Sequence, residues 1–359
     1  MKVYSDIRGQ DDHKTQSTTR SSGQRIKDND YEDPAVFSAL DLGTNNCRML
    51  VAKPEKNSFK VVDSFSRITR LGEGLSSSGY LSPGAMDRTV EALKRCALKM
   101  KQRKVTAYRN VATEACRRAE NCHEFLGRVI EDTGIELEII SAHEEAELAL
   151  KGCESLLDKN IPHALIFDIG GGSTEVLYAK IDKQVGMVVV GSVSLPLGVI
   201  TVTEDCGGGD LCERTYSEVT EHVERLLQPF EDACGISTEV SSGNAQMIGT
   251  SGTVTTLGGL YLGLSRYDRN TVDGLSLDFE SLRTMSLRLC RMSLHERAAE
   301  PCIGWQRADL MLAGCAILEA ICRLWAVGKL RVADRSLREG MLLEMMQAVR
   351  DKETGVRFV

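Results

Sequence analysis

The sequence lacks an excess of basic residues and a long apolar run. Acidic residues outnumber basic ones by 51 to 44, which gives a net charge of -7. This charge argues against a general binder of nucleic-acid polymers or of membrane surfaces. No apolar run reaches the length of a membrane span, and the first residues lack the hydrophobic core of a signal peptide. We therefore expect a cytoplasmic protein with no membrane partner.

Paired cysteine motifs are also missing. The chain has 12 cysteines, but they are scattered and none forms a Cys-x-x-Cys pair. Cys206 and Cys212 flank a glycine-rich stretch that has no histidine nearby. We expect reduced, mostly buried thiols, and neither a zinc site nor a structural disulfide.

The start of the chain has little that could form a core. Residues 1–34 are rich in Asp, Ser, Thr, Gln, Lys and Arg and show no apolar periodicity. Such a segment cannot bury enough surface to offset its ordering entropy, so we expect a disordered tail. The rest of the chain is long enough for two domains with full cores.

Beyond this tail, the same order of strand-like and helical patterns occurs twice. Each half begins with three strand-like runs and then turns helical, which predicts an α/β fold of two related domains with a cleft between them. We expect the first domain over 35–148, together with a terminal helix at 336–350, and the second over 149–335. The predicted strands are 36–40, 47–53, 59–66, 110–113, 136–140, 164–167, 175–181, 187–194 and 330–334, and the longer predicted helices are 82–101, 121–133, 142–152, 215–230 and 305–328.

One loop pattern also occurs twice, in LDLGTN at 40–45 and in FDIGGGST at 167–174. Each copy places a carboxylate, Asp41 or Asp168, at the end of a strand, and small residues follow it. Successive N–H groups in such a turn can bind an anion, and the Asp can hold a hard cation. Either copy alone could be only a tight hairpin, but two facing copies would grip a metal-bound phosphate chain. The candidate phosphate-binding residues are Gly43, Thr44, Asn45, Gly170, Gly171, Gly172, Ser173 and Thr174.

A third segment, IGTSGT at 248–253, has the same small-residue character. It leads into a predicted helix at about Thr253, so free N–H groups and the positive end of the helix would face an anion. Alone it could be an ordinary strand-to-helix turn. As the third such loop, it adds Gly249, Thr250, Ser251 and Gly252 to the candidate phosphate-binding residues.

Glu145 is the candidate general base. Ser141 and Glu144 match a capping box that opens a helix to about Gly152. Glu145 falls within the apolar arc of this helix, beside Leu148, where a carboxylate is costly unless it is paired or functional. The alternatives are a solvated Glu and a structural ion-pair partner.

Arg117 follows a predicted strand, where it could clamp phosphate through two hydrogen bonds and stabilise developing charge. A surface salt bridge is the alternative, and we favour that alternative for Arg118. We expect His143, a lone histidine near Glu145, to be structural.

Together these segments resemble the exopolyphosphatase and guanosine pentaphosphate phosphohydrolase (Ppx/GppA) family over residues 36–346. The elements that carry the resemblance are ALDLGTNNCRMLVA, RLGEGL, VATEACRRAEN, EIISAHEEAELA, FDIGGGSTE, LPLGV, IGTSGT and ADRSLREGMLLE. The resemblance implies two ribonuclease H-like domains of the actin-like ATPase superfamily, in the short two-domain form of the family. Thr44 and Asn45 stand where many relatives have Ser-Asn, so the hydroxyl is retained.

The resemblance also implies roles for individual residues. Glu145 would activate the attacking water, while Asp41, Asp168 and Glu175 would form the Mg²⁺ environment. The loop from Gly170 to Ser173 would bind phosphate together with Arg117.

The implied activity is Mg²⁺-dependent hydrolysis of the terminal phosphoanhydride of inorganic polyphosphate. Phosphoryl transfer needs positioning and charge neutralisation more than covalent catalysis, which suits these loops and one carboxylate. Three alternatives stay open: conversion of guanosine pentaphosphate to tetraphosphate, an actin-like ATP-binding switch, and a small-molecule kinase. Chain-length preference and the formation of a homodimer also stay open.

Overall fold

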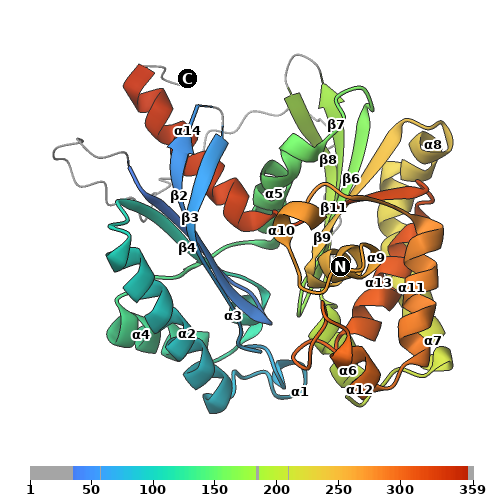
Figure 1. Ribbon diagram of the computed structural model, residues 1–359, viewed down its shortest axis with the longest axis horizontal. Coiled ribbons are helices and arrows are strands. Elements are labelled where there is room, and N and C mark those ends of the chain that lie inside the picture. Colours follow the sequence, from blue (N-terminus) through green and yellow to red (C-terminus); the bar gives the residue numbers. More distant parts are fainter. Residues whose placement is uncertain (1–34, 57, 183–185, 209, 355–359) are drawn as a thin grey trace, which may run out of the picture.

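The computed structural model describes residues 35–56, 58–182, 186–208 and 210–354. The predicted disordered tail at 1–34 lies outside these residues. Within them, two β-sheets with flanking helices form a two-domain α/β fold (Figure 1).

The sheet of the first domain has five strands: β1 (Phe37–Leu42), β2 (Asn46–Glu55), β3 (Ser58–Ile68), β4 (Ala107–Ala112) and β5 (Glu138–Ile139). Their order across the sheet is β3-β2-β1-β4-β5. β1, β2 and β3 form an antiparallel meander, and β4 and β5 continue the sheet parallel to β1. This order is the one expected of a ribonuclease H-like domain.

The second sheet has six strands: β6 (His163–Ile169), β7 (Thr174–Asp182), β8 (Gly186–Leu195), β9 (Ala245–Ser251), β10 (Ser276–Asp278) and β11 (Lys329–Ala333). The order β8-β7-β6-β9-β11 repeats that of the first sheet, and β10 is added antiparallel at the β11 edge. The predicted duplication of one α/β plan is therefore confirmed.

Helices cover both faces of each sheet. On the first sheet they are α2 (Pro83–Gln102) and α4 (Cys122–Thr133) on one face, and α5 (Ala142–Cys153) and α14 (Leu337–Thr354) on the other. The second sheet carries α6 (Val199–Asp205), α7 (Glu213–Cys234), α9 (Gly252–Tyr261), α11 (Phe279–Arg291) and α13 (Met311–Leu324) on one face. The remaining short helices are α1 (Leu75–Ser78), α3 (Glu114–Arg118), η1 (Glu154–Leu156), α8 (Ile236–Ser241), α10 (Arg269–Val272) and α12 (Leu294–Ala299).

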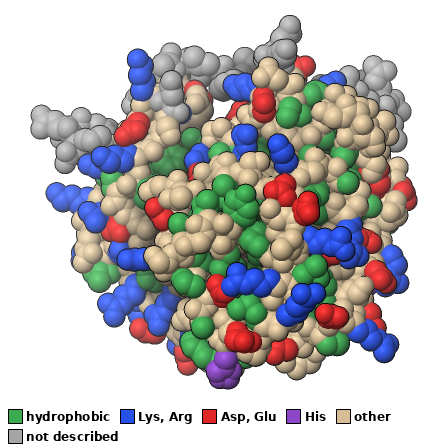
Figure 2. All heavy atoms as spheres, turned by 45° about the vertical axis from the view of Figure 1, so that its right-hand side comes forward, with side chains coloured by type: hydrophobic (Ala, Val, Ile, Leu, Met, Phe, Trp, Pro, Cys, Tyr) green, Lys and Arg blue, Asp and Glu red, His purple; other side chains and the backbone are tan. Residues whose placement is uncertain are grey.

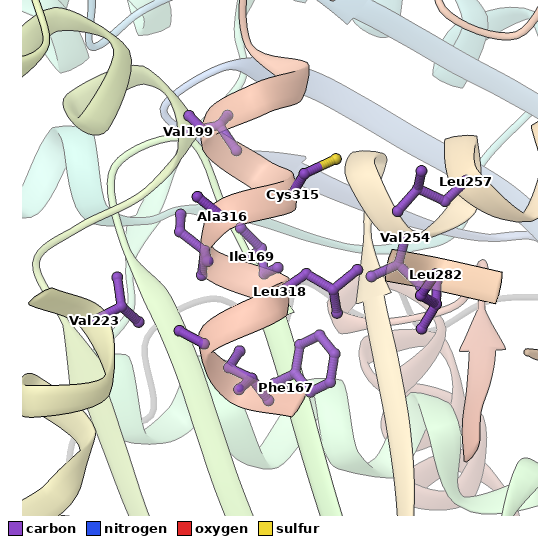
Figure 3. Packing of buried hydrophobic residues seen from close by; sticks show 14 of the residues in the cluster. Phe167, Ile169, Val199, Val223, Val254, Leu257, Leu282, Cys315, Ala316 and Leu318 are labelled. Atoms are coloured by element: carbon purple, nitrogen blue, oxygen red, sulfur yellow. The ribbon is translucent and has the colours of Figure 1, made fainter. Parts of the chain in front are cut away.

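The larger core lies between the second sheet and its helices. Figure 3 shows α13 at its centre, with Cys315, Ala316 and Leu318 beside Phe167 and Ile169 of β6. All of these side chains are at most 4% exposed. Since β6 is anchored from this side, its end is held in place where Asp168 begins the glycine-rich loop.

Two helices, α5 and α14, lie between the domains (Figure 1). Leu148 of α5 packs into the core of the first sheet, whereas Ala146 and Leu150 of the same helix pack against the second. α14 follows β11 of the second sheet but packs on β1 and α5. At their crossing, a side chain at Gly152 would collide with the backbone of Ser336, so the two helices meet backbone to backbone.

The helix predicted over 305–328 is shorter than expected, since α13 covers only 311–324. Gly304 takes a left-handed conformation at φ 69°, and its carbonyl accepts from the N–H groups of Arg307 and Ala308 in a run of turns. The buried guanidinium of Arg297 donates to the carbonyls of Met292 and Ala308. These bonds hold the 305–310 segment in turns and direct Arg307 toward the cleft.

The surface fits the charge balance of the sequence. On the face drawn in Figure 2, acidic and basic side chains are interspersed rather than gathered into one basic field.

None of the helices in the described ranges has the length and apolar character needed to cross a bilayer. All twelve cysteines are free thiols, and most of them are buried.

Candidate active site

A cavity of about 110 Å³ lies in the cleft between the two domains. Residues from both hairpins, from the third loop and from α5 line this cavity. Of the predicted site residues, those that line it are Asp41, Gly43, Thr44, Asn45, Glu145, Asp168, Gly170, Gly171, Ser173, Glu175, Ser251 and Gly252. Most of the predicted set therefore converges on one place.

The two hairpins share one backbone geometry. In the first, the N–H of Gly43 donates to the carbonyl of Asn46 at 2.9 Å, and in the second the N–H of Gly170 donates to that of Ser173 at 2.9 Å. Between these ends, the N–H groups of Gly171 and Gly172 donate no hydrogen bond to any described residue. Such free amides at the end of a strand can bind phosphate oxygens.

The loops of the two hairpins pack directly on each other. A Cβ added at Gly171 would lie 3.0 Å from the Asn45 Cβ, and one at Gly172 would lie 2.8 Å from Thr44 Oγ1. The first turn of α6 holds the second loop from behind, because the N–H of Val199 donates to the Gly170 carbonyl at 2.9 Å. The glycines are thus required by close contact between the two domains.

The third loop divides into two parts. Ser251 caps α9 by accepting from the N–H of Val254 at 3.0 Å, and α9 begins at Gly252, one residue before the predicted start. Gly249 and Thr250 instead lie within β9 and do not line the cavity. Gly249 makes room for the Phe167 ring, so its small size serves packing.

Two more predicted residues lie beside the cavity rather than on its wall. Gly172 packs against Thr44, and Thr174 begins β7, where its hydroxyl donates to the Leu197 carbonyl at 2.8 Å. Both support the loop from the side.

Asp41, Asp168 and Glu175 have raised pKa values, and burial is the main cause. The pKa of Asp168 rises to about 6 and that of Glu175 to about 7, while the pKa of Asp41 also lies above its ordinary value. Negative neighbours add to the effect, since Asp41 acts on Asp168 and Asp168 acts on Glu175. Hydrogen bonds oppose it: Ser336 Oγ donates to Asp168 Oδ2 at 2.9 Å, and Ser194 Oγ donates to Glu175 Oε1 at 3.0 Å.

Glu145 reaches the cavity from the first turn of α5, with 18% of its side chain exposed. Burial and the nearby Glu175 raise the pKa of Glu145 well above its ordinary value. Arg117 opposes this shift by donating from Nη1 to Glu145 Oε2 at 2.8 Å. Its other donors go to Glu114 Oε2, at 2.9 and 3.1 Å, and to the Ile140 carbonyl, at 2.9 Å. The guanidinium of Arg117 is thus held between two carboxylates.

The start of α5 differs from the predicted capping box. The Ser141 hydroxyl accepts from the N–H of Glu144 at 3.1 Å, as expected. The side chain of Glu144 pairs with Arg109 instead of reaching back to Ser141, because Arg109 on the neighbouring β4 provides a charged partner. His143 is exposed and lies 3.4 Å from Glu147, away from the cavity.

The donors at the cavity fit Mg²⁺. Within the described ranges, no three Asp, Glu, His or Cys side chains converge closely enough to hold an ion alone. Mg²⁺ usually keeps several waters and binds through one or two carboxylates together with substrate phosphates, so three are not needed. The side-chain oxygens of Asn45 and Asn46 are buried without a hydrogen-bond partner, as expected beside a place for bound water or ligand. A cation here would also relieve the repulsion among the carboxylates.

Two arginines that line the cavity, Arg48 and Arg307, were not among the predicted site residues. Within the described part of the chain, no carboxylate forms an ion pair with either guanidinium, although Arg307 makes a long contact of 3.4 Å with the Thr256 hydroxyl. Burial, with a further contribution from Arg48, lowers the pKa of Arg307. Two positive groups that repel each other in a cleft are suited to an anion with several charges.

Comparison with known proteins gives matches over nearly the whole globular region. The model of the Ppx/GppA phosphatase family matches residues 50–349. Exopolyphosphatase 2 of Mycobacterium tuberculosis is 28% identical over 321 residues, which cover 86% of this chain and 98% of that protein.

Solved structures agree. The crystal structure of the Aquifex aeolicus member of the Ppx/GppA family has a TM-score of 0.71 at 27% identity, and the match covers 88% of this chain and 99% of that chain. An exopolyphosphatase from Cytophaga hutchinsonii has a TM-score of 0.78 at 22% identity, with 87% and 98% of the two chains covered. The second likeness shows a shared fold.

Proposed function

Since this chain belongs to the Ppx/GppA phosphatase family, we propose that it is a Mg²⁺-dependent exopolyphosphatase, which releases orthophosphate from the end of inorganic polyphosphate. The observation that carries the proposal is the single cavity where amide-lined loops, buried carboxylates and two arginines meet. This combination suits a phosphate chain with a bound cation, because it offers donors for phosphate oxygens and oxygen ligands for the metal.

The loops and the arginines bind and orient the substrate. The free N–H group of Gly171 and the N–H groups in the first turn of α9, after Ser251, donate to the terminal phosphate. Arg48 and Arg307 neutralise the charge of the chain that leaves. The backbone amides of the loops are held in place by the bonds that close each turn, so they need little reorganisation when charge develops on the leaving oxygen.

Glu145 acts as the general base. It takes a proton from a water molecule as the water oxygen forms a bond to the terminal phosphorus, and the phosphoanhydride bond breaks toward the shortened chain. Arg117 holds this carboxylate in place and favours its charged form. The raised pKa of Glu145 makes it a better proton acceptor than an ordinary surface Glu, provided that it is ionised at the working pH.

Asp41, Asp168 and Glu175 would provide the oxygen ligands for Mg²⁺, directly or through bound water. When bound, Mg²⁺ would neutralise phosphate charge and hold the chain in line. The pairing of β6 with β7 keeps Asp168 and Glu175 side by side.

A phosphate-release assay tests the proposal. Purified full-length protein is given long-chain polyphosphate, guanosine pentaphosphate or ATP, each with Mg²⁺ or with excess chelator. We expect the largest kcat/KM for polyphosphate and no turnover in chelator. Preference for guanosine pentaphosphate would assign the other activity that the family resemblance implies, and turnover of ATP alone would point to an actin-like switch. Full activity in chelator would reject the metal requirement.

A further inference from the structure

Ser336 joins the second domain's loop to the helix that crosses between the domains. Its Oγ donates to Asp168 Oδ2 at 2.9 Å, although the two residues are 168 positions apart in the chain. Ser336 lies directly before α14 and is 9% exposed. A buried hydroxyl aimed at a buried carboxylate fixes one of the two carboxylate oxygens and leaves the other for a ligand.

The sequence around Ser336 explains why this contact is unusual. Ser336 and Glu339 have the spacing of a capping box, in which the serine hydroxyl accepts from the N–H of the glutamate. The bond from the glutamate side chain is present, because Glu339 Oε2 accepts from the N–H of Ser336 at 2.9 Å. The hydroxyl proton of Ser336, however, is directed to Asp168. The Ser336 hydroxyl therefore has its partner outside its own helix.

The backbone of Ser336 is held firmly from two sides. Glu339, with 4% of its side chain exposed, accepts from Arg269 Nη2 at 2.5 Å, so the acceptor for the Ser336 N–H is itself fixed. On the other side, the Ser336 carbonyl lies against Gly152 of α5 with no room for a side chain. Gly340 meets the Leu148 carbonyl of α5 in the same way.

α5 is the helix that carries Glu145. The contacts of Ser336 thus connect Asp168, which stands at the end of β6, to the helix that presents the proposed base. A shift of α14 would change the distance between the carboxylates of Asp168 and Glu145. Groups that hydrogen-bond to metal-ligating carboxylates set their orientation and contribute to metal affinity.

We propose that Ser336 is a positioning residue, which orients the Asp168 carboxylate for the divalent cation and fixes it relative to α5. This inference rests on the proposed function, because it assumes that Asp168 belongs to the cation site. It predicts that loss of the hydroxyl weakens cation binding before any substrate is present.

The test is direct binding of Mn²⁺, with free Mn²⁺ measured by electron paramagnetic resonance and Mg²⁺ used as competitor. Ser336→Ala should raise the dissociation constant by roughly 10- to 100-fold, the range typical for loss of such a supporting group. Ser336→Thr keeps the hydroxyl and should restore most of the affinity. Ser293→Ala is the matched control, since Ser293 caps α12 in a capping box with Glu296 and does not line the cavity, and it should leave the affinity unchanged.

Circular dichroism on each preparation shows whether it is folded, and Ser336→Cys replaces the alanine variant if that variant does not fold. Wild-type affinity in a folded Ser336→Ala or Ser336→Cys protein would overturn the role of Ser336 and leave the proposed function standing. Failure of the wild-type protein to bind Mn²⁺ or Mg²⁺, both alone and with inorganic phosphate present, would reject the cation site itself. Equal losses in Ser336→Ala and Ser293→Ala would assign the effect to helix capping and would also overturn the inference.

Discussion

The two hairpins of the cleft have the same backbone but opposite chemistry. Both place an Asp at the end of a strand and close the turn with one 2.9 Å bond from a glycine N–H. In both, the residue opposite the Asp on the next strand reaches the cavity. That residue is Arg48 in the first hairpin and Glu175 in the second.

The loops differ in the same complementary way. The first contains Thr44, Asn45 and Asn46, whereas the second has Gly171 and Gly172 in the positions of Thr44 and Asn45. The side chains of the first loop occupy the space that the glycines leave. The two hairpins therefore contribute different groups to the cavity, although they share one backbone geometry. The first contributes a cationic side chain and polar side chains, and the second contributes free amides and carboxylates.

The largest loss of activity should follow when the first hairpin is given a carboxylate at the position where the second hairpin has one. In Arg48→Glu, a carboxylate joins a cluster in which burial already raises pKa values, and a phosphate partner is lost. We expect kcat/KM for polyphosphate to fall by more than the roughly 10²- to 10³-fold typical for loss of one charge-stabilising donor. Arg95→Glu on the exposed surface of α2 is the control for a change in net charge. Similar losses in both variants would show that Arg48 has no special place.

A methyl group added to each loop should lower the stability by different amounts, because the two loops are packed differently. Gly171→Ala puts a Cβ 3.0 Å from Asn45, whereas in Gly43→Ala the nearest atom, the Asn46 carbonyl oxygen, is 3.6 Å away. Overpacking of this kind costs about 1–3 kcal/mol. Urea unfolding should therefore show a clear loss of stability for Gly171→Ala and little change for Gly43→Ala. The reverse order would contradict the close contact between the loops.

The smallest expected effect is a pH dependence of stability that belongs to the second hairpin. With folded pKa values of about 6 for Asp168 and about 7 for Glu175, the folded state binds protons more readily than the unfolded state. Without a divalent cation, these two groups make the free energy of unfolding highest below about pH 4 and lower it as the pH rises to about 7.

Mg²⁺ should stabilise the protein more at pH 8 than at pH 5, because it favours the ionised carboxylates. Urea unfolding of the wild type and of Glu175→Gln, in chelator and in Mg²⁺, measures this difference. The variant should show a weaker pH dependence between pH 5 and 7. An unchanged profile would mean that Glu175 is ionised throughout this range.

Much of the fold could be predicted from the sequence. The repeated order of strands and the two Asp-Gly turns are local patterns, and their predicted positions agree with β1, β2, β6 and β7 within a few residues. The segment that carries Arg307 could not be predicted in the same way. Its apolar spacing continues that of α13, but the buried Arg297 and the left-handed Gly304 hold it in turns. Gly304 directly precedes the segment, but the bond from Arg297 to the Ala308 carbonyl depends on the burial of Arg297 in the tertiary fold.

The residues of the site also differ in how far the sequence could have predicted them. Arg48 could have been found, because it occupies the position in the first hairpin that Glu175 has in the second. Nothing local distinguishes Ser336 from an ordinary helix cap, since its partner Asp168 is brought near only by the tertiary fold. Likewise, the sequence indicates that Arg117 is near the cleft but not that Glu114 and Glu145 share its donors.

The Glu145→Gln variant shows whether Glu145 activates water. This variant keeps the size of the side chain but removes the proton acceptor. Phosphate release from long polyphosphate, polyphosphate affinity and melting temperature are measured on one preparation. We predict that turnover falls by at least roughly 10²- to 10⁴-fold while affinity and melting temperature change little. Near-normal phosphate release would show that Glu145 is not the base, and a large fall in melting temperature would make Glu145 a structural ion-pair partner of Arg117 instead.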